Sequence, residues 1–374
     1  MRFLLVVFLV ECAYGGFFDL TDVEDPLALL WNPRQPEQRL TECKAQTESG
    51  IKYGVCTPYS NCLLSRGRPN GIFENTCGKT SDTKVAYFEG SDVQTGATPC
   101  TYTVKLKNTN ICQVRLDFVK FNLAPATLTT TSTHTPSYKC INDILRIQPN
   151  HYNIPDLCGN NDKQHVYVHV NQSDGVTKGV HLDITLADRL LNRYLPSPSW
   201  KIKVTQLECP GYRTGFDITS NDYIQDFPLL APSGAIQYFT EPSGYIKSFG
   251  FDGSVARQSY TYGQKYAVAF QRGVKICGIK FIPEQIYLPH DGIRYYGDEN
   301  CKHYLFVPDL SFDNSSPTVH NLKNRVCLTE VEEFRSYAPG PLFVHFNSMK
   351  SDFITDETLQ QGFNIRYELL NRCP

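Results

Sequence analysis

Two histidines, His165 and His169, stand four residues apart in the run QHVYVHV, and imidazole is a common ligand of zinc. Their alternation with Val166, Val168 and Val170 is typical of a β-strand. Residues four apart on a strand lie about 13 Å apart, whereas an imidazole–metal bond is about 2 Å long. Because one metal ion cannot reach both side chains, the sequence predicts no metal site here. It predicts the polar face of a half-buried strand.

The chain contains 14 cysteines, but none is arranged as Cys-x-x-Cys, and the closest two are Cys56 and Cys62. Zinc modules use tighter ligand pairs than this. Disulfide bonds are therefore the better interpretation, and disulfides form and persist in oxidising compartments such as the extracellular space.

The first 15 residues have the pattern of a secretory signal peptide. Arg2 supplies a positive charge, an apolar run extends from Phe3 to Val10, and Ala13 and Gly15 are small residues that suit a cleavage site. We predict cleavage after Gly15 and a secreted protein. The apolar run is too short to span a bilayer, and no later stretch is long enough, so we expect no membrane insertion.

Glycan acceptor motifs and charge agree with an extracellular protein. Asn171-Gln-Ser and Asn314-Ser-Ser are acceptor motifs for N-glycosylation. Lys and Arg number 36 against 38 Asp and Glu, whereas a nucleic-acid partner requires a basic face that neutralises phosphates. We therefore expect a glycoprotein that does not bind nucleic acid.

Short segments of alternating polarity recur between clusters of Gly, Pro, Asn and Asp. Residues 101–107 (TYTVKLK), 112–118 (CQVRLDF) and 180–186 (VHLDITL) each place apolar side chains on one face. No segment holds a helical period for long. The pattern predicts an all-β protein built from antiparallel β-sandwiches.

The chain also repeats itself. Residues 200–209 (WKIKVTQLEC) and 363–373 (FNIRYELLNRC) each combine an aromatic residue, an alternating strand and a terminal cysteine. Four cysteines recur in order, at steps of 28, 18 and 51 residues and then of 24, 26 and 46. The repeat predicts two homologous domains, residues 77–209 and 210–374. They follow a loop-rich N-terminal segment, residues 16–76.

Four cysteine segments of the first unit form an early and a later pair. The early segments are Cys77-Gly-Lys-Thr and Pro99-Cys100-Thr-Tyr-Thr-Val, and the later ones are Cys140-Ile-Asn-Asp and Cys158-Gly. These segments resemble those of a CUB domain, a compact antiparallel β-sandwich that usually has an early and a later disulfide.

The second unit resembles the same family in a divergent form. Cys301 and Cys327 match the later pair, and residues 361–367 (QGFNIRY) resemble the closing strand. More narrowly, the whole chain resembles a group of secreted arthropod proteins with two such units behind a cysteine-bearing N-terminus. The similar phrases are ICQVRLDF (111–118), QH (164–165) and IQYF (236–239).

The resemblance and the repeat together imply a disulfide framework: Cys77–Cys100, Cys112–Cys209, Cys140–Cys158, Cys277–Cys373 and Cys301–Cys327. The early pair of the second unit would fall near Ala235 and Ala269, and the joint loss of both cysteines fits a bonded pair. Cys43, Cys56 and Cys62 stay unassigned. Because three cysteines cannot pair among themselves, one of them is free or forms an intermolecular disulfide.

The family resemblance also suggests that calcium could bind. Many CUB domains hold calcium with a Glu before the third cysteine, an Asp three residues after it, and a late Asp before the closing strand. Asp143 fits the second role in the first unit, and Asp352 fits the last role in the second. No Glu occupies the required stretch of the first unit, and Tyr304 stands where the second unit needs its Asp. Calcium takes six to eight oxygen ligands, so we expect no intact metal site.

The sequence lacks the motifs of common catalytic sites. It has no Gly-x-Ser-x-Gly elbow, no His-Glu-x-x-His motif and no phosphate-binding glycine loop. Two small disulfide-bonded sandwiches also leave little room for a deep cleft. We expect neither enzymatic activity nor a cofactor.

These observations favour a secreted, non-enzymatic recognition module whose rigidly held loops bind an extracellular protein or glycan. Two alternatives stay open. The protein could regulate, or act as a cofactor of, an extracellular protease cascade through the segment from Cys43 to Cys62. It could also be a structural component of a matrix or cuticle that is cross-linked through the odd cysteine.

Overall fold

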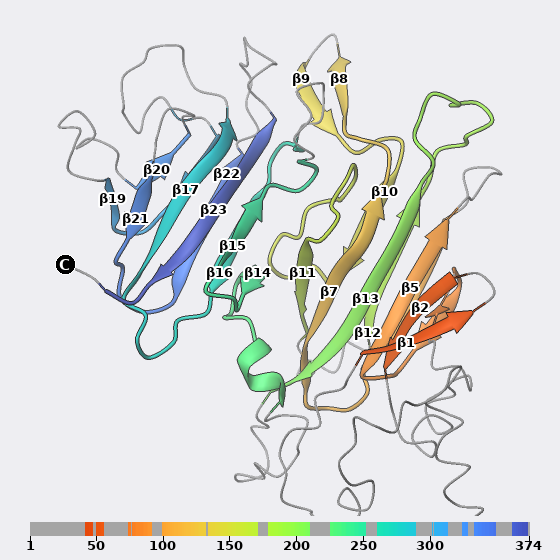
Figure 1. The fold of residues 1–374 in the computed structure, drawn as a ribbon. Helices are drawn as coiled ribbons and strands as arrows, with labels where there is room; N and C mark the ends of the chain where they lie inside the picture. The colour runs from red at the N-terminus through yellow and green to blue at the C-terminus, as the bar shows by residue number, and fades with distance from the viewer. Residues whose placement is uncertain are drawn as a thin grey trace, which may run out of the picture.

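The computed structural model describes residues 42–47, 50–55, 74–75, 77–91, 99–131, 134–170, 179–209, 225–251, 260–288, 301, 303–312, 324–327, 333–348 and 361–372. Nearly all regular structure in these ranges is β-strand (Figure 1). The exception within them is a short helical turn that includes the 3₁₀ helix η2 (Phe227–Leu229). The predicted all-β class is confirmed.

The first sandwich packs a four-stranded sheet, in the order β10-β12-β6-β4, on a five-stranded sheet, in the order β11-β7-β13-β5-β3. Its neighbouring strands are antiparallel, except that β4 runs parallel to β6 and β3 runs parallel to β5. The strands are β3 (Glu74–Asn75), β4 (Lys79–Ser81), β5 (Val85–Ser91), β6 (Cys100–Lys105), β7 (Ile111–Asn122), β10 (Ile144–Gln148), β11 (His165–His169), β12 (Gly179–Thr185) and β13 (Ser199–Glu208).

Side-chain alternation builds the core of this sandwich. The strands predicted from 101–107, 112–118 and 180–186 are β6, β7 and β12, and their apolar faces point inward. Phe88 stacks on Tyr102, with ring centroids 4.9 Å apart, and lies 5.7 Å from the ring of Trp200. Gly90 is the ladder partner of Trp200, and a Cβ at Gly90 would overlap the indole ring.

The second sandwich packs two five-stranded sheets, in the orders β14-β16-β22-β18-β20 and β15-β23-β17-β21-β19. Here β14 runs parallel to β16. The strands are β14 (Ala235–Phe239), β15 (Ser243–Lys247), β16 (Lys265–Phe270), β17 (Gly278–Tyr287), β18 (His303–Phe306), β19 (Leu310–Phe312), β20 (Arg325–Val326), β21 (Phe334–Ser336), β22 (Leu342–Ser348) and β23 (Gly362–Leu370).

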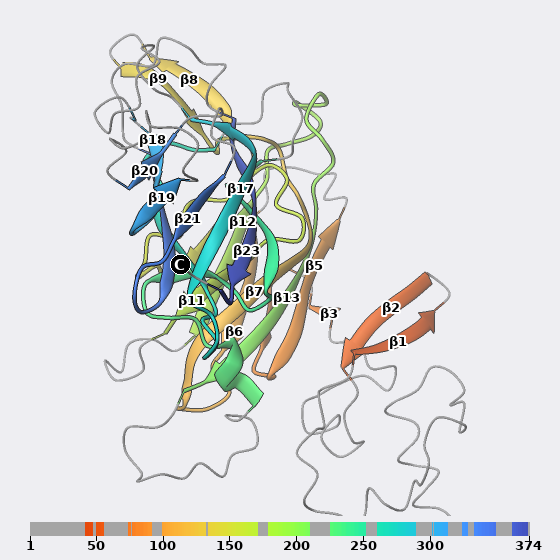
Figure 2. The ribbon, with the colours of Figure 1, turned by 60° about the vertical axis from the view of Figure 1, so that its left-hand side comes forward.

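The two sandwiches share one topology. The predicted closing strands are β13 and β23, and each pairs antiparallel with a long strand, β7 or β17. The parallel pair β4–β6 of the first sandwich corresponds to the parallel pair β14–β16 of the second. Two hairpins lie outside the sandwich sheets (Figure 2): β1 (Glu42–Thr47) with β2 (Gly50–Val55), and β8 (Thr127–Thr131) with β9 (His134–Lys139).

Four disulfides join described residues, and each is a pair that the sequence implied. Their Cα–Cα distances are 4.8 Å for Cys77–Cys100, 5.6 Å for Cys112–Cys209, and 5.7 Å for both Cys140–Cys158 and Cys301–Cys327. Cys277 is also disulfide-bonded. Its expected partner Cys373, together with Cys56, Cys62 and the side chain of Cys43, lies outside the described residues.

Asp143, the calcium candidate of the first unit, forms a buried ion pair. One carboxylate oxygen accepts a hydrogen bond from the backbone N–H of Ala187 at 3.1 Å, and the other accepts from that of Ala124 at 2.7 Å. The guanidinium of Arg189 donates to both oxygens, at 2.9 and 2.5 Å. Arg189 therefore supplies the positive charge that a bound cation would have brought. Asp352 lies outside the described residues.

We predict that Arg189→Ala destabilises the first sandwich strongly, because it leaves the buried Asp143 carboxylate without a counter-charge. Breaking a buried pair from one side costs about 3–5 kcal/mol. Urea denaturation of the mature protein measures the loss. The exposed Arg146 pairs with Asp156 at the surface and provides the control, since Arg146→Ala should cost less than about 1 kcal/mol. A chelator that lowers the melting temperature of the wild type by many degrees would contradict this assignment.

A second prediction concerns Cys277. Its backbone N–H donates to the carbonyl of Leu370 at 2.9 Å. Leu370 is the last residue of β23 and precedes Cys373 by three positions, so Cys277 lies close to the segment that contains Cys373. We expect non-reducing peptide mapping to recover Cys277–Cys373. A bridge from Cys277 to Cys43, Cys56 or Cys62 would be inconsistent with the predicted framework.

Candidate binding groove between the two sandwiches

The sandwiches meet along two edge strands, β11 of the first and β14 of the second (Figure 1). An edge strand exposes backbone N–H and C=O groups that need partners. Histidine side chains of β11 provide them for β14. The backbone N–H of Tyr238 donates to Nε2 of His165 at 2.9 Å, and Nε2 of His169 contacts the carbonyl oxygen of Ala235 at 2.7 Å.

The prediction that His165 and His169 lie on the polar face of a half-buried strand was wrong. His165 is buried and His169 is only partly exposed, because β14 covers this face of β11. Burial, reinforced by the charge of Arg115, lowers the pKa of His165 well below its usual 6.5. Burial also lowers the pKa of His169, and His151 adds to the effect. Both side chains therefore favour the neutral state while the sandwiches are in contact.

Two further polar contacts link β7 and β11 to the segment that leads into β14. The side-chain amide of Gln113 donates to the carbonyl of Ala231 at 2.7 Å, and its carbonyl oxygen accepts from the N–H of Ala231 at 2.9 Å. The hydroxyl of Tyr167 donates to the carbonyl of Leu229 at 2.9 Å. An apolar cluster surrounds these bonds: Tyr167, Leu207, Ala231, Ala235, Tyr238 and Ala269.

Ala235 and Ala269, which matched the missing early cysteine pair, belong to this interface. Both are fully buried in the cluster that contains Tyr167. They are not ladder partners, since Ala235 is opposite Ala267 and Tyr238 is opposite Ala269. Their small side chains allow the first sandwich to pack closely on β14 and β16.

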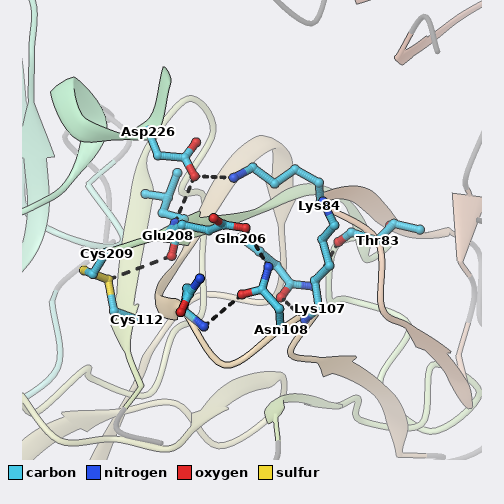
Figure 3. Close-up of polar contacts among 11 residues, drawn as sticks. Thr83, Lys84, Lys107, Asn108, Cys112, Gln206, Glu208, Cys209 and Asp226 are labelled. Atoms are coloured by element: carbon cyan, nitrogen blue, oxygen red, sulfur yellow. Dashed lines mark hydrogen bonds and ion pairs between the residues drawn. A yellow bond between two sulfur atoms is a disulfide. The ribbon is translucent and has the colours of Figure 1, made fainter. Parts of the chain in front are cut away.

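Asp226, in the segment between the sandwiches, is anchored to the base of the first sandwich (Figure 3). Its carboxylate pairs with Lys84 and accepts the backbone N–H of Glu208 at 2.9 Å. Asn108 in turn donates to the carboxylate of Glu208 at 2.6 Å. The side-chain amide of Gln206 completes the network with hydrogen bonds to backbone groups of the adjacent loops. The segment that enters the second sandwich is thus held to β13 through Asp226 and to β7 through the hydrogen bonds between Gln113 and Ala231.

A groove of about 620 Å³ opens beside this junction. The loop 151–153 of the first sandwich forms one wall, and the outer face of the β14-β16-β22-β18 sheet forms the floor. Its described lining contains no Asp or Glu: His151, Tyr152, Asn153, Ser233, Gly234, Lys265, Tyr266, Ala267, Tyr304, Phe306, Phe343, His345, Phe346 and Asn347. The sequence led us to expect little room for a deep cleft in two small sandwiches, whereas the structure has this open groove between them.

Aromatic rings dominate the floor. Phe343 stacks on His345 with ring centroids 5.8 Å apart, and Phe306 lies 6.1 Å from His345. The guanidinium of Arg325 lies 4.3 Å from the ring centroid of Tyr304. Asn347 donates to the hydroxyl of Tyr304 at 2.8 Å. The floor therefore offers ring faces flanked by amide, hydroxyl and imidazole groups.

The equivalent sheet of the first sandwich is polar on its outer face. On β12, His181 and Asp183 alternate with buried apolar residues, where β22 has Phe343 and His345. On β10, Arg146 points outward, where β18 has Tyr304 and Phe306. Because the two sandwiches share one topology, their outer faces can be compared strand by strand, and only the face of the second sandwich is aromatic. The sequence signal was present in LFVHFNS (342–348), where both faces of an alternating strand carry large rings.

Tyr152 couples the groove wall to the junction. Its hydroxyl is 2.8 Å from Oγ of Ser233, and its ring packs edge-on against His169 with centroids 4.7 Å apart. A second cavity of about 490 Å³ shares His151, Tyr152 and Ser233 and extends toward the Cys112–Cys209 disulfide. The groove therefore depends on the contact between the two sandwiches.

The remaining sequence-predicted sites lie elsewhere. Asn171, Asn314 and the signal peptide, residues 1–15, fall outside the described residues. Within the described part of the chain, no group of three or more His, Cys, Asp or Glu residues could hold a metal ion. The helices in that same part include none that is long and apolar enough to cross a membrane.

Comparison with known proteins supports the fold. The animal CUB domain family matches residues 232–370, which cover the second sandwich. A search of the curated proteins gave no match. The family match identifies a CUB domain in the second sandwich, and proteins with CUB domains are typically extracellular binding modules.

Three solved structures are similar at a TM-score of 0.24 each. The CUB1-EGF-CUB2 domains of rat MASP-1 are 10% identical, with 78% of this chain and 99% of that chain covered. The CUB1-EGF-CUB2 domain of human MASP-1/3 is 10% identical, with 77% and 100% covered. The extracellular region of zebrafish Gpr126/Adgrg6 is 9% identical, with 79% and 37% covered. Likeness at this level supports no conclusion about function. The sheets, the four disulfides and the family match together give an all-β chain with two tandem CUB-like sandwich domains.

Proposed function

We propose that this protein is a secreted, non-enzymatic recognition module that binds a glycan in the groove between its two sandwiches. The observation that carries the proposal is the aromatic outer face of the second sandwich, where the equivalent face of the first is polar. Ligand sites are typically concave and lined by aromatic side chains with a few polar groups that fix the orientation.

The chemistry of the floor favours a sugar. Sugar rings present apolar C–H faces and polar hydroxyl edges. The rings of Phe343 and Tyr304 can stack on the C–H faces, while His345, Asn347 and Ser233 can pair with hydroxyls. A volume of about 620 Å³ lies in the usual range of small-molecule sites and suits an oligosaccharide segment.

Secretion and the lack of enzymatic activity complete the proposal. A disulfide framework of this density fits an oxidising, extracellular location. The protease-cascade and matrix alternatives depend on Cys43, Cys56 and Cys62, whose side chains lie outside the described residues. No contact among the described residues favours either alternative. The narrower resemblance to secreted arthropod proteins stays a prediction.

We predict that Phe343→Ala and Tyr304→Ala each weaken glycan binding by about tenfold or more, since loss of an aromatic anchor typically costs more than 1 kcal/mol. The measurement is retention of the mature protein on an array of neutral, sialylated and sulfated oligosaccharides, followed by titration of the best ligand.

Tyr245→Ala is the matched control, because Tyr245 is 48% exposed on β15, in the opposite sheet of the same sandwich. This variant should bind as the wild type does. Retention of no oligosaccharide, or equal losses in all three variants, would refute the glycan assignment. Capture of a protein partner that is sensitive to Phe343→Ala would instead favour a protein ligand in the same groove.

A further inference from the structure

The contact between His165 and Tyr238 fixes the protonation state of the histidine. Nε2 of His165 accepts the backbone N–H of Tyr238 at 2.9 Å, so this nitrogen must carry a lone pair and the ring must be neutral. A proton on Nε2 would place two N–H donors against each other inside a buried junction. The ring is enclosed by Tyr167, with centroids 5.7 Å apart, and by Phe239, with centroids 4.8 Å apart.

The charged groups around His165 do not favour an imidazolium. The positive charge of Arg115 on β7 lowers the pKa of His165 and so disfavours a second positive charge beside it. Asp117, the ladder partner of His165 on β7, is already paired with Arg115 at 2.7 Å. From the second sandwich, the groups that face this region are the phenol of Tyr238 and, behind Phe239, the phenol of Tyr367.

His169 connects the same strand contact to the groove. Its Nε2 donates to the carbonyl of Ala235, a hydrogen bond that neutral and protonated histidine can both make. Its ring packs on Tyr152, which forms the wall of the groove, and His151 is the titratable neighbour. A movement of β11 relative to β14 would therefore displace Tyr152 and alter the wall of the groove.

We propose that the β11–β14 junction is a proton-sensitive clasp: protonation of His165 separates the two strands and opens the groove, so that a bound ligand is released as the pH falls. The release step rests on the proposed function, and the opening of the clasp does not. The clasp would let the protein hold its ligand at extracellular pH and release it in an acidified compartment.

The direction of the effect follows from linkage. The burial that β14 imposes lowers the pKa of His165, whereas Arg115 belongs to the first sandwich and acts in both states, so the separated state binds more protons than the docked state as the pH falls. The equilibrium constant for docking then decreases by up to about tenfold per pH unit, until the docked histidine itself titrates. His169, whose pKa is also lowered, adds to the decrease. Docking is therefore strongest above the usual histidine pKa.

Small-angle X-ray scattering of the full mature chain, without ligand, tests the clasp between about pH 7.4 and pH 5. We expect the radius of gyration of the wild type to increase reversibly over this range. Dispersed NMR methyl signals should persist, since each sandwich keeps its own core. His165→Gln is the critical variant: its amide oxygen can accept the N–H of Tyr238 at every pH, so this variant should open less than the wild type, with only the contribution of His169 left.

His181→Gln is the matched control, because His181 is an exposed histidine on β12, away from the junction. It should open as the wild type does. A wild type that stays docked at about pH 5, or a His165→Gln variant that opens as far as the wild type does, overturns the clasp. Glycan binding that is lost in Phe343→Ala but unchanged between the two pH values would support the groove and reject the clasp. Opening without any glycan binding would support the clasp and reject the groove.

Discussion

The arrangement of this molecule depends on how two sheet edges meet. β11 and β14 each end a sheet, and direct backbone pairing would join those sheets into one continuous ladder. Instead, two imidazoles of β11 contact the backbone at the edge of β14. His165 accepts a backbone N–H, and His169 contacts a backbone carbonyl. A side-chain contact of this kind fixes the register of the two strands. Unlike a backbone ladder, it also depends on the protonation state of its members.

The strand pair that carries the early disulfide in the first sandwich takes part in the junction in the second. In the first sandwich, Cys77–Cys100 ties the start of the parallel β4–β6 pair together. In the second, the corresponding β14–β16 pair packs Ala235 and Ala269 against Tyr167 of the first sandwich. Docking thus constrains β14 in the second sandwich, where no disulfide joins the corresponding strands.

The sequence was sufficient for the features that depend on local period and on the repeat. Alternation in residues 101–107 and 112–118 predicted β6 and β7, and recurrence of cysteines predicted pairs such as Cys112–Cys209. It was insufficient for His165, because strand alternation shows which side chains share a face and not what packs on that face. Asp143 likewise has the residue type of a calcium ligand, and only the fold brings Arg189, 46 positions later, onto its carboxylate.

The comparison of the two sandwiches also bears on why the groove is aromatic. An outer face that meets only water tolerates His181, Asp183 and Arg146, as the first sandwich shows. Large rings on such a face lose favourable burial, and exposed apolar patches typically mark interaction sites. Part of the aromatic face of the second sandwich is covered by the loop 151–153, and the rest lines the groove. The same docking that buries the histidines therefore creates the concave wall that makes these rings a binding site and not merely a flat patch.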